Sequence, residues 1–253
     1  MKKILLEISY LGSDFCGYQV QPDKRTVQSQ LNNAAKALFG FDCDIVGCSR
    51  TDSGVHANQF FATLTQKGTD YIETDIPAEK IPLALSFHLP SDIAVKNARW
   101  VDADFHPRYS VKSKEYLYRL YCDSVRNPFD EGRAWHYTRR IDDEAFEKMQ
   151  IAAKSFIGTH DFAAFMASNS SVSNTVRTIY SLEIERCGNM ISVRVCGDGF
   201  LYNMVRIIVG TLISVAEGKI AHTEIESIIE SKNRARAGIT APPQGLYLNK
   251  VLY

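Results

Sequence analysis

Arg50 and Asp52 are the two side chains of this sequence whose types and spacing best suit a chemical role. They lie in a turn-like run between two apolar stretches, Cys48-Ser49-Arg50-Thr51-Asp52-Ser53-Gly54-Val55-His56-Ala57. A glycine-assisted turn can hold a carboxylate outside the core, where it can act on a substrate as a nucleophile or as a stabiliser of positive charge. The alternative is an Asx-turn that only joins two strands, which is the common role of an isolated Asp-x-Gly.

Arg206 is a third candidate, because it is the one charged residue in an otherwise apolar run over residues 200–216. A buried guanidinium left without a partner costs several kcal/mol, so a carboxylate is expected to face it. The alternative is a narrow polar stripe of Asn203, Arg206 and Gly210, from which the arginine reaches solvent.

Tyr116 and Tyr118 lie two residues apart on a predicted strand, so their side chains share one face. Most such pairs pack in a core or against a neighbouring strand, and this role fits Tyr118. An aromatic ring can also stack on a nucleobase, which contributes about 1 to 3 kcal/mol.

These segments resemble motifs of the tRNA pseudouridine synthase A family. The run at Asp52 resembles the family's Arg-Thr-Asp-x-Gly-Val-His-Ala motif, residues 198–206 resemble a second signature that contains the arginine, and residues 114–118 resemble its Lys-x-Tyr-x-Tyr motif. Further matches, in the same order along the chain, are residues 10–19, 21–28, 105–110, 160–162, 175–179 and 241–248. Three positions depart from the family pattern: Tyr18 replaces the usual Trp, Ser49 the usual Gly, and Pro107 the usual Ala.

The resemblance implies that the protein isomerises uridine to pseudouridine in the anticodon stem-loop of tRNA, at positions 38, 39 and 40. It implies a homodimer that needs no cofactor, and the sequence has no phosphate-binding glycine-rich loop or dinucleotide fingerprint. Asp52 would be the nucleophile, Arg206 its paired cation and Tyr116 the ring that stacks on the target uracil. The implied substrate contacts are Arg50, Arg108, Lys114, Tyr116 and Arg126. Whether Asp52 first attacks C1′ or removes the C2′ proton stays open.

The elements that must position these residues follow one order in each half of the chain. In the first half we predict strands over 3–10, 44–48, 58–65 and 93–101, with helices over 26–40 and 78–87. In the second half we predict strands over 114–122, 179–186, 190–196 and 245–252, with helices over 142–156 and 201–217 and a short helix at 225–229.

Each half therefore has the strand and helix order of a ferredoxin-like, split βαβ unit. We predict an α+β protein in which two such halves join into one extended, mostly antiparallel sheet with helices on one face and a central cleft. The first half, residues 1–104, carries the Asp52 turn. The second half, residues 105–253, carries Tyr116 and Arg206.

Charge is balanced overall but unevenly distributed, with 29 basic and 29 acidic residues in 253. Residues 99–140 carry nine Lys and Arg against six Asp and Glu, and residues 186–253 carry eight against five, whereas residues 141–185 carry three against seven. The two basic segments could form an RNA-binding face. The alternative is that they are solvated faces of unrelated elements.

Cysteine and hydropathy patterns argue against a metal centre and against a membrane protein. The six cysteines include no Cys-x-x-Cys pair and have no metal-ligand spacing beside a pair of histidines, so we expect no metal site. The apolar run 200–216 is short for a membrane span and is interrupted by polar residues. We expect a cytoplasmic protein with no membrane role.

Two other classes of function compete with the isomerase. A ferredoxin-like sheet with exposed aromatic rings could bind single-stranded RNA without catalysis. A metal-assisted hydrolase could use Asp52, His56 and Asp161, although we expect His56 to be a packed turn residue and the pair His160-Asp161 to be structural.

Overall fold

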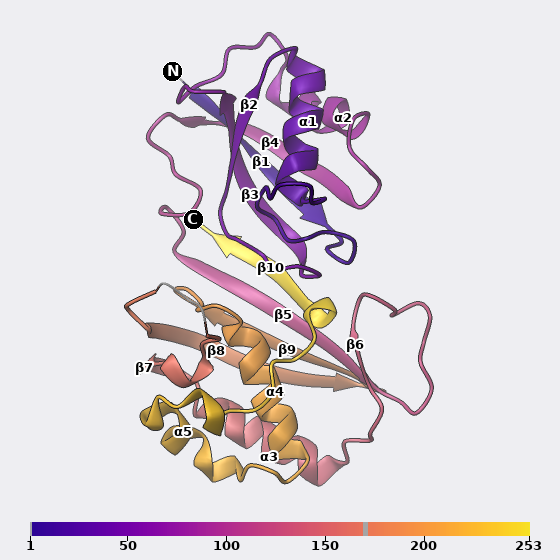
Figure 1. The fold of residues 1–253 in the computed structure, drawn as a ribbon, viewed down its shortest axis with the longest axis vertical. Coiled ribbons are helices and arrows are strands. Elements are labelled where there is room, and N and C mark those ends of the chain that lie inside the picture. The colour runs from indigo at the N-terminus through magenta and orange to yellow at the C-terminus, as the bar shows by residue number, and fades with distance from the viewer. Residues whose placement is uncertain (1, 169–171) are drawn as a thin grey trace. The chain divides into compact units, whose positions relative to one another are not determined.

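The computed structural model describes residues 2–168 and 172–253, and it is α+β in class as predicted (Figure 1). Contacts divide the chain into two compact units. Unit 1 contains Met1–Lys112 and Tyr247–Tyr253, and unit 2 contains Ser113–Leu246. The predictions made for residue 1 and for residues 169–171 of the acidic segment lie outside the described residues.

Unit 1 contains a sheet built around β1 (Lys2–Tyr10). This strand pairs antiparallel with β4 (Ile93–Asp102) on one edge and with β3 (His56–Gln66) on the other. Two strands share the remaining edge of β3. β2 (Cys43–Gly47) pairs antiparallel with the C-terminal half of β3. β10 (Leu246–Leu252) pairs in parallel with the first residues of β3. The predicted strands of the first half are therefore all present.

The helices of unit 1 cover one face of this sheet (Figure 1). The helix α1 (Val27–Phe39) begins after Thr26, whose side chain accepts a hydrogen bond from the Ser29 amide, and ends at Gly40 in the left-handed conformation. This confirms the helix predicted over 26–40. The second predicted helix consists of a 3₁₀ turn (Ala78–Lys80) followed by α2 (Ile81–Ser86), which tolerates Pro82 in its first turn.

In unit 2, β5 (Ser113–Cys122) pairs antiparallel with β9 (Met190–Gly197). β9 forms the predicted hairpin with β8 (Val176–Cys187), and β8 pairs with the short β7 (Gly158–Asp161). A second short strand, β6 (Trp135–Tyr137), runs parallel to the end of β5. The helices are α3 (Asp143–Lys154), α4 (Met204–Ala216) and α5 (Ile225–Ser231). Short 3₁₀ turns occur at Ala163–Phe165, His222–Glu224, Arg234–Arg236 and Pro243–Gly245.

Three details of the second half differ from the prediction. The strands β6 and β7 were not expected, because three or four residues are too few to establish an alternating pattern. Helix α4 begins at Met204 rather than at 201, because Asn203 has a positive φ of 59° and cannot continue a right-handed helix. The last strand, predicted for the second half, pairs with β3 and belongs almost entirely to unit 1.

The boundary between the units also lies later than the one predicted at 104/105, since the first unit extends to Lys112. The ferredoxin-like description of the halves, their joining into one sheet and the cleft between them stay predictions. Within residues 2–168 and 172–253, none of the helices has the length and apolar character that crossing a membrane requires.

Candidate active site

Asp52 lies in the segment that connects β2 to β3 in unit 1, and it opens a tight turn. The Val55 amide donates to the Asp52 carbonyl over 3.1 Å, and Gly54, the third residue of the turn, has φ of 78°. A positive φ at this position is what a type II turn requires, and glycine adopts it without strain. The predicted turn is therefore present, and it leaves the Asp52 side chain half-buried.

The loop over residues 11–18 holds this turn from behind. Tyr18 donates its amide to the Thr51 carbonyl over 3.1 Å, while the Gly54 amide and the Ser53 hydroxyl both donate to the Phe15 carbonyl, over 3.3 and 3.2 Å. The loop lies very close to the turn at Gly12, where a Cβ atom would be 1.9 Å from the Val55 oxygen. Two backbone segments far apart in sequence thus form one rigid support for Asp52.

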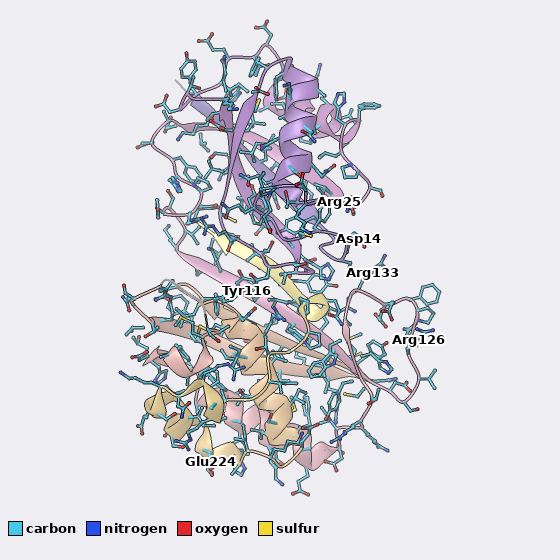
Figure 2. All side chains as sticks on the ribbon, viewed as in Figure 1. Asp14, Arg25, Tyr116, Arg126, Arg133 and Glu224 are labelled. Carbon is cyan, nitrogen blue, oxygen red and sulfur yellow. The ribbon has the colours of Figure 1, made fainter. Side chains whose placement is uncertain are left out.

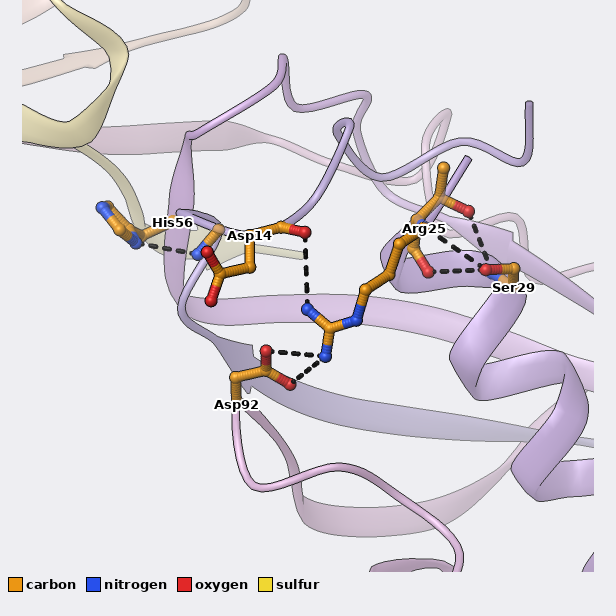
Figure 3. Close-up of polar contacts among 7 residues, drawn as sticks. Asp14, Arg25, Ser29, His56 and Asp92 are labelled. Atoms are coloured by element: carbon orange, nitrogen blue, oxygen red, sulfur yellow. Dashed lines mark hydrogen bonds and ion pairs between the residues drawn. The ribbon is translucent and has the colours of Figure 1, made fainter. Parts of the chain in front are cut away.

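Buried side chains complete the support. The hydroxyls of Tyr10 and Thr51 are hydrogen-bonded over 2.8 Å, and both residues are buried. The Gly12 amide donates to Nδ1 of His56 over 2.8 Å (Figure 3). The His56 ring also stacks on Tyr247, with centroids 4.5 Å apart. Because Nδ1 accepts a hydrogen bond, the ring proton of neutral His56 is on Nε2. His56 is fully buried and is a packed residue, as predicted.

An exposed ion pair anchors the supporting loop on its outer side. One guanidinium nitrogen of Arg25 contacts both carboxylate oxygens of Asp92, at 3.1 and 2.8 Å, and another donates to the Asp14 carbonyl at 3.4 Å (Figure 3). The same guanidinium lies over the Phe15 ring, 4.0 Å from its centroid. These contacts, like the Tyr10–Thr51 bond, join residues that lie ten or more positions apart. Sequence spacing therefore gave no signal for them, although Tyr10 and Arg25 lie in motifs that match the family.

The predicted substrate contacts are distributed over both units. Arg50 and Arg108 lie in unit 1, and Lys114 and Arg126 lie in unit 2. The three arginines are exposed, and Lys114 is half-buried on β5. Figure 2 shows Arg126 on the loop that follows β5.

Tyr116 and Tyr118 both lie on β5, and Tyr118 is a core residue, as predicted, while the stacking of Tyr116 on uracil stays a prediction. Tyr116 is 8% exposed and packs edge-to-face against Phe200, with ring centroids 5.1 Å apart. Tyr118 is fully buried and donates its hydroxyl to the Pro242 carbonyl over 2.7 Å. Burial raises the pKa of Tyr118 far above its ordinary value, so its hydroxyl is a permanent donor in the core of unit 2.

Arg206 lies in the first turn of α4, and its guanidinium is fixed within unit 2. Its Nε donates to the Ala241 carbonyl and one terminal nitrogen to Oδ1 of Asn203, each over 2.7 Å. Gly210 is not part of a polar stripe, because a Cβ atom there would lie 1.8 Å from the Ile239 oxygen. The side chain is therefore held in place rather than extended freely into solvent. Its pairing with Asp52 stays a prediction.

The pair His160-Asp161 is structural, as predicted. Asp161 accepts hydrogen bonds from Thr175 Oγ1 at 2.5 Å and from the Ala163 amide at 3.1 Å, and its second oxygen forms an ion pair with Lys232 at 2.8 Å. These contacts hold the pKa of the Asp161 carboxyl below its ordinary value, with Lys232 the largest cause. Among residues 2–168 and 172–253, no group of three His, Cys, Asp or Glu side chains could hold a metal ion.

Comparisons with known proteins agree with the motifs. Residues 8–110 and 152–253 match the family model described as tRNA pseudouridine synthase. The tRNA pseudouridine synthase A of Thermoanaerobacter sp. (strain X514) is 45% identical over 253 residues, which is 100% of both chains. The protein of the same name from Bacillus subtilis (strain 168) is 44% identical over 252 residues, or 97% of both chains.

A solved structure of a Cbf5-Nop10-Gar1 complex also matches, over 96% of this chain and 57% of that chain. Its sequence identity of 12% and TM-score of 0.35 are too low to support any conclusion. The family model covers most of the chain, and the curated relatives align with it from end to end. The chain therefore belongs to the tRNA pseudouridine synthase family, whose members are isomerases.

Proposed function

We propose that this protein isomerises uridine to pseudouridine in the anticodon stem-loop of tRNAs, at positions 38, 39 and 40, with Asp52 as the nucleophile. The observation that carries the proposal is the Asp52 turn. An acidic side chain within the family's motif projects from a backbone that the loop 11–18 holds by three hydrogen bonds to residues 51, 53 and 54. Such fixed presentation is what a nucleophile requires.

The reaction breaks the bond between N1 of uracil and C1′ of the sugar, turns the base and joins C5 to C1′. The atoms of the product are those of the substrate, so the reaction needs no oxidant, water or energy source. A carboxylate suits it, because it can bond to the sugar carbon or stabilise the positive charge that develops as the base leaves. The guanidinium of Arg206 would keep Asp52 ionised, since a nearby opposite charge favours the charged form.

A stacked uridine must leave the RNA helix before Asp52 can reach its sugar, at a cost of a few kcal/mol. We assign Arg50 to the space that the nucleotide vacates, because it is exposed and lies two residues from Asp52. Tyr116 would stack on the everted uracil and assist the loss of the C5 proton after rearrangement. Arg108, Lys114 and Arg126 would contact the RNA around the site.

The proposal is tested by Asp52→Asn, which keeps the shape of the side chain and removes its charge. We expect the variant to bind tRNA as the wild type does. Its rate of tritium release from tRNA labelled at C5 of uridine should fall by a factor on the order of 10⁴ or more, as for the loss of other nucleophiles. Asp14→Asn is a matched control, because Asp14 is an exposed acid on the adjacent loop. Appreciable turnover by Asp52→Asn would exclude Asp52 as the nucleophile.

Two other functions predict different results in the same assay. A non-catalytic RNA-binding protein would bind tRNA stoichiometrically without tritium release. A hydrolase using Asp52, His56 and Asp161 would lose activity on exhaustive chelation. The side chains that would bind the metal argue against the hydrolase, because His56 Nδ1 and both Asp161 oxygens already have partners within their own units.

We further propose that the protein is a cytoplasmic homodimer that binds tRNA across both subunits. The six cysteines support a reducing compartment, because disulfides persist in oxidising environments and the structure joins none of these cysteines in one. Light scattering of the purified protein, alone and with tRNA, would measure the number of subunits in the complex.

A further inference from the structure

The loop over residues 105–110 of unit 1 presents an aromatic ring to solvent. Tyr109 is 80% exposed, yet one face of its ring is stacked on His106, with centroids 4.3 Å apart and an angle of 28° between the ring planes. Arg108 is exposed beside it. One face of the Tyr109 ring therefore stays available to a flat ligand.

Hydrogen bonds fix the conformation of this loop. Nδ1 of His106 accepts from the amides of Arg108 and Tyr109, over 3.1 and 3.3 Å, and the His106 carbonyl accepts from the Ser110 amide over 3.0 Å. The ring on which Tyr109 stacks is thus tied to the backbone that carries Tyr109.

Tyr253 anchors the same loop to the body of unit 1. Its hydroxyl donates to the Pro107 carbonyl over 2.7 Å. Its ring packs against Phe61 and Phe105, with centroids 5.3 and 5.1 Å away. A ring that is held in position before a ligand arrives loses little conformational entropy on binding.

Single exposed aromatic residues are common and need no functional explanation. Phe87 and Phe129 are 82% and 84% exposed, and within the described part of the chain no ring contact involves either of them. Tyr109 differs from both in having a stacked partner, a fixed loop and a guanidinium next to it. Arg108 and Lys3 both place positive charge near His106, which favours contact with a polyanion.

We propose that Tyr109 stacks on an unpaired base of the RNA substrate while Arg108 contacts a neighbouring phosphate. The inference rests on the proposed function, because it takes tRNA as the ligand. It adds a base-binding position, built by His106 and Tyr253, that is separate from the target uridine. Stacking on an aromatic face tolerates any base, so this contact orients the RNA without reading its sequence.

The first experiment measures the equilibrium binding of a tRNA transcript by the wild-type protein and by variants substituted at Tyr109. Tyr109→Ala should raise Kd by about 5- to 150-fold, the range observed for loss of one stacked base. Tyr109→Phe, which keeps the aromatic face, should keep most of the affinity, whereas Tyr109→Leu should resemble Tyr109→Ala. The loss should appear in KM rather than in kcat, because the contact is equal in the ground state and the transition state. Phe87→Ala is the matched control and should bind as the wild type does.

The second experiment separates the ring from the charge by measuring Kd as a function of salt concentration. Arg108→Gln should reduce the slope of log K against log salt by about 0.7 to 0.9, the value for one phosphate contact, while Tyr109→Ala should leave the slope unchanged. The inference is overturned if Tyr109→Ala binds as tightly as the wild type, or if the Phe and Leu variants bind equally.

An outcome that refutes the proposed activity can be distinguished from one that refutes the stacking contact at Tyr109. A wild-type protein that binds tRNA but forms no pseudouridine would refute the proposed activity, and the Tyr109 series would still decide the stacking contact. A wild-type protein that does not bind tRNA would refute both.

Discussion

The position of Asp52 depends on polar groups that are buried beneath it. The Tyr10 and Thr51 hydroxyls satisfy each other, and His56 accepts from the Gly12 amide with a ring that solvent does not reach. A buried polar group that loses its partner costs about 1 to 3 kcal/mol, so each of these bonds restrains its neighbours. The Asp52 turn is therefore oriented by buried groups that lie behind it in unit 1.

His106 makes the conformation of the loop over residues 105–110 depend on pH. Partial burial lowers the pKa of His106 below its ordinary value of 6.5, and the cations Arg108 and Lys3 lower it further. The neutral ring is the form that accepts from two amides, and protonation at Nδ1 abolishes both bonds. Because the pKa is lower in the folded loop, the stability that His106 contributes is complete above pH 6.5 and is lost as the pH falls through the folded-state pKa.

We therefore expect the affinity for tRNA to fall as the pH is lowered from about 7 to about 5 at constant ionic strength. Simple electrostatics predicts the reverse, because added positive charge strengthens binding to a polyanion. Fluorescence anisotropy with labelled tRNA would measure the affinity at each pH. His106→Asn should weaken binding at pH 7 and flatten the pH profile, whereas substitution of the exposed His88 by Asn should change neither. An affinity that rises steadily on acidification would refute this role of His106.

The helices and the longer strands followed from local sequence signals. Helix α1 has a side-chain cap at Thr26 and a glycine at its end, so its bounds could be predicted to within a residue or two. The turn at Asp52 was equally predictable, because the motif and the glycine at 54 are contiguous. What sequence could not provide is the set of contacts behind the turn, since Tyr10 and Thr51 lie 41 positions apart and Gly12 and His56 lie 44 apart.

The close approach of the loop 11–18 to the turn makes Gly12→Ala a sharp test of the support. The added methyl would lie 1.9 Å from the Val55 oxygen, which is backbone and cannot rotate away, so the two segments must separate. We expect a loss of about 2 to 4 kcal/mol in the free energy of unfolding, as for strained or overpacked sites, and a fall in kcat of the protein that remains folded. Urea unfolding and the tritium assay would measure the two effects.

Gly40→Ala is the matched control for Gly12→Ala. Gly40 ends α1 with φ of 78°, and nothing lies within 4 Å of the Cβ position. This substitution adds backbone strain of about 1 kcal/mol without moving the Asp52 turn, so kcat should not change. A Gly12→Ala variant with full kcat would show that the loop does not position Asp52.

Unit 1 is assembled from two separate parts of the chain, and this arrangement could not be predicted from the order of elements. The parallel register places Tyr247 beside His56 and Leu248 beside Ala57, after 134 intervening residues of unit 2. Pairing between strands so far apart in sequence leaves no signal in the residues around them. The order of helices and strands was equally compatible with β10 in the first half or in the second half. The overall charge of zero likewise did not indicate whether the protein binds RNA, because such binding depends on where the basic segments lie in the fold.

The contribution of β10 to unit 1 is tested by Tyr247→Ala. Tyr247 is buried and its ring covers His56, so we expect a loss of about 3 to 5 kcal/mol, typical of removing a buried aromatic side chain. Hydrogen exchange should accelerate at the amides of residues 56 and 57 while helix α4 stays protected. Leu252→Ala on the same strand is the control, because Leu252 is exposed, and it should change stability by less than about 0.5 kcal/mol. Unchanged exchange at the start of β3 in Tyr247→Ala would contradict this role of β10.

The split arrangement of unit 1 also constrains how the protein is made. A ribosome must translate all of residues 113–246 after the Asp52 turn has emerged and before β10 becomes available. Until then the nascent chain lacks the ring that covers His56 and the tyrosine that anchors residues 105–110. A growing polypeptide therefore cannot complete the packing behind the Asp52 turn until synthesis has passed through this strand.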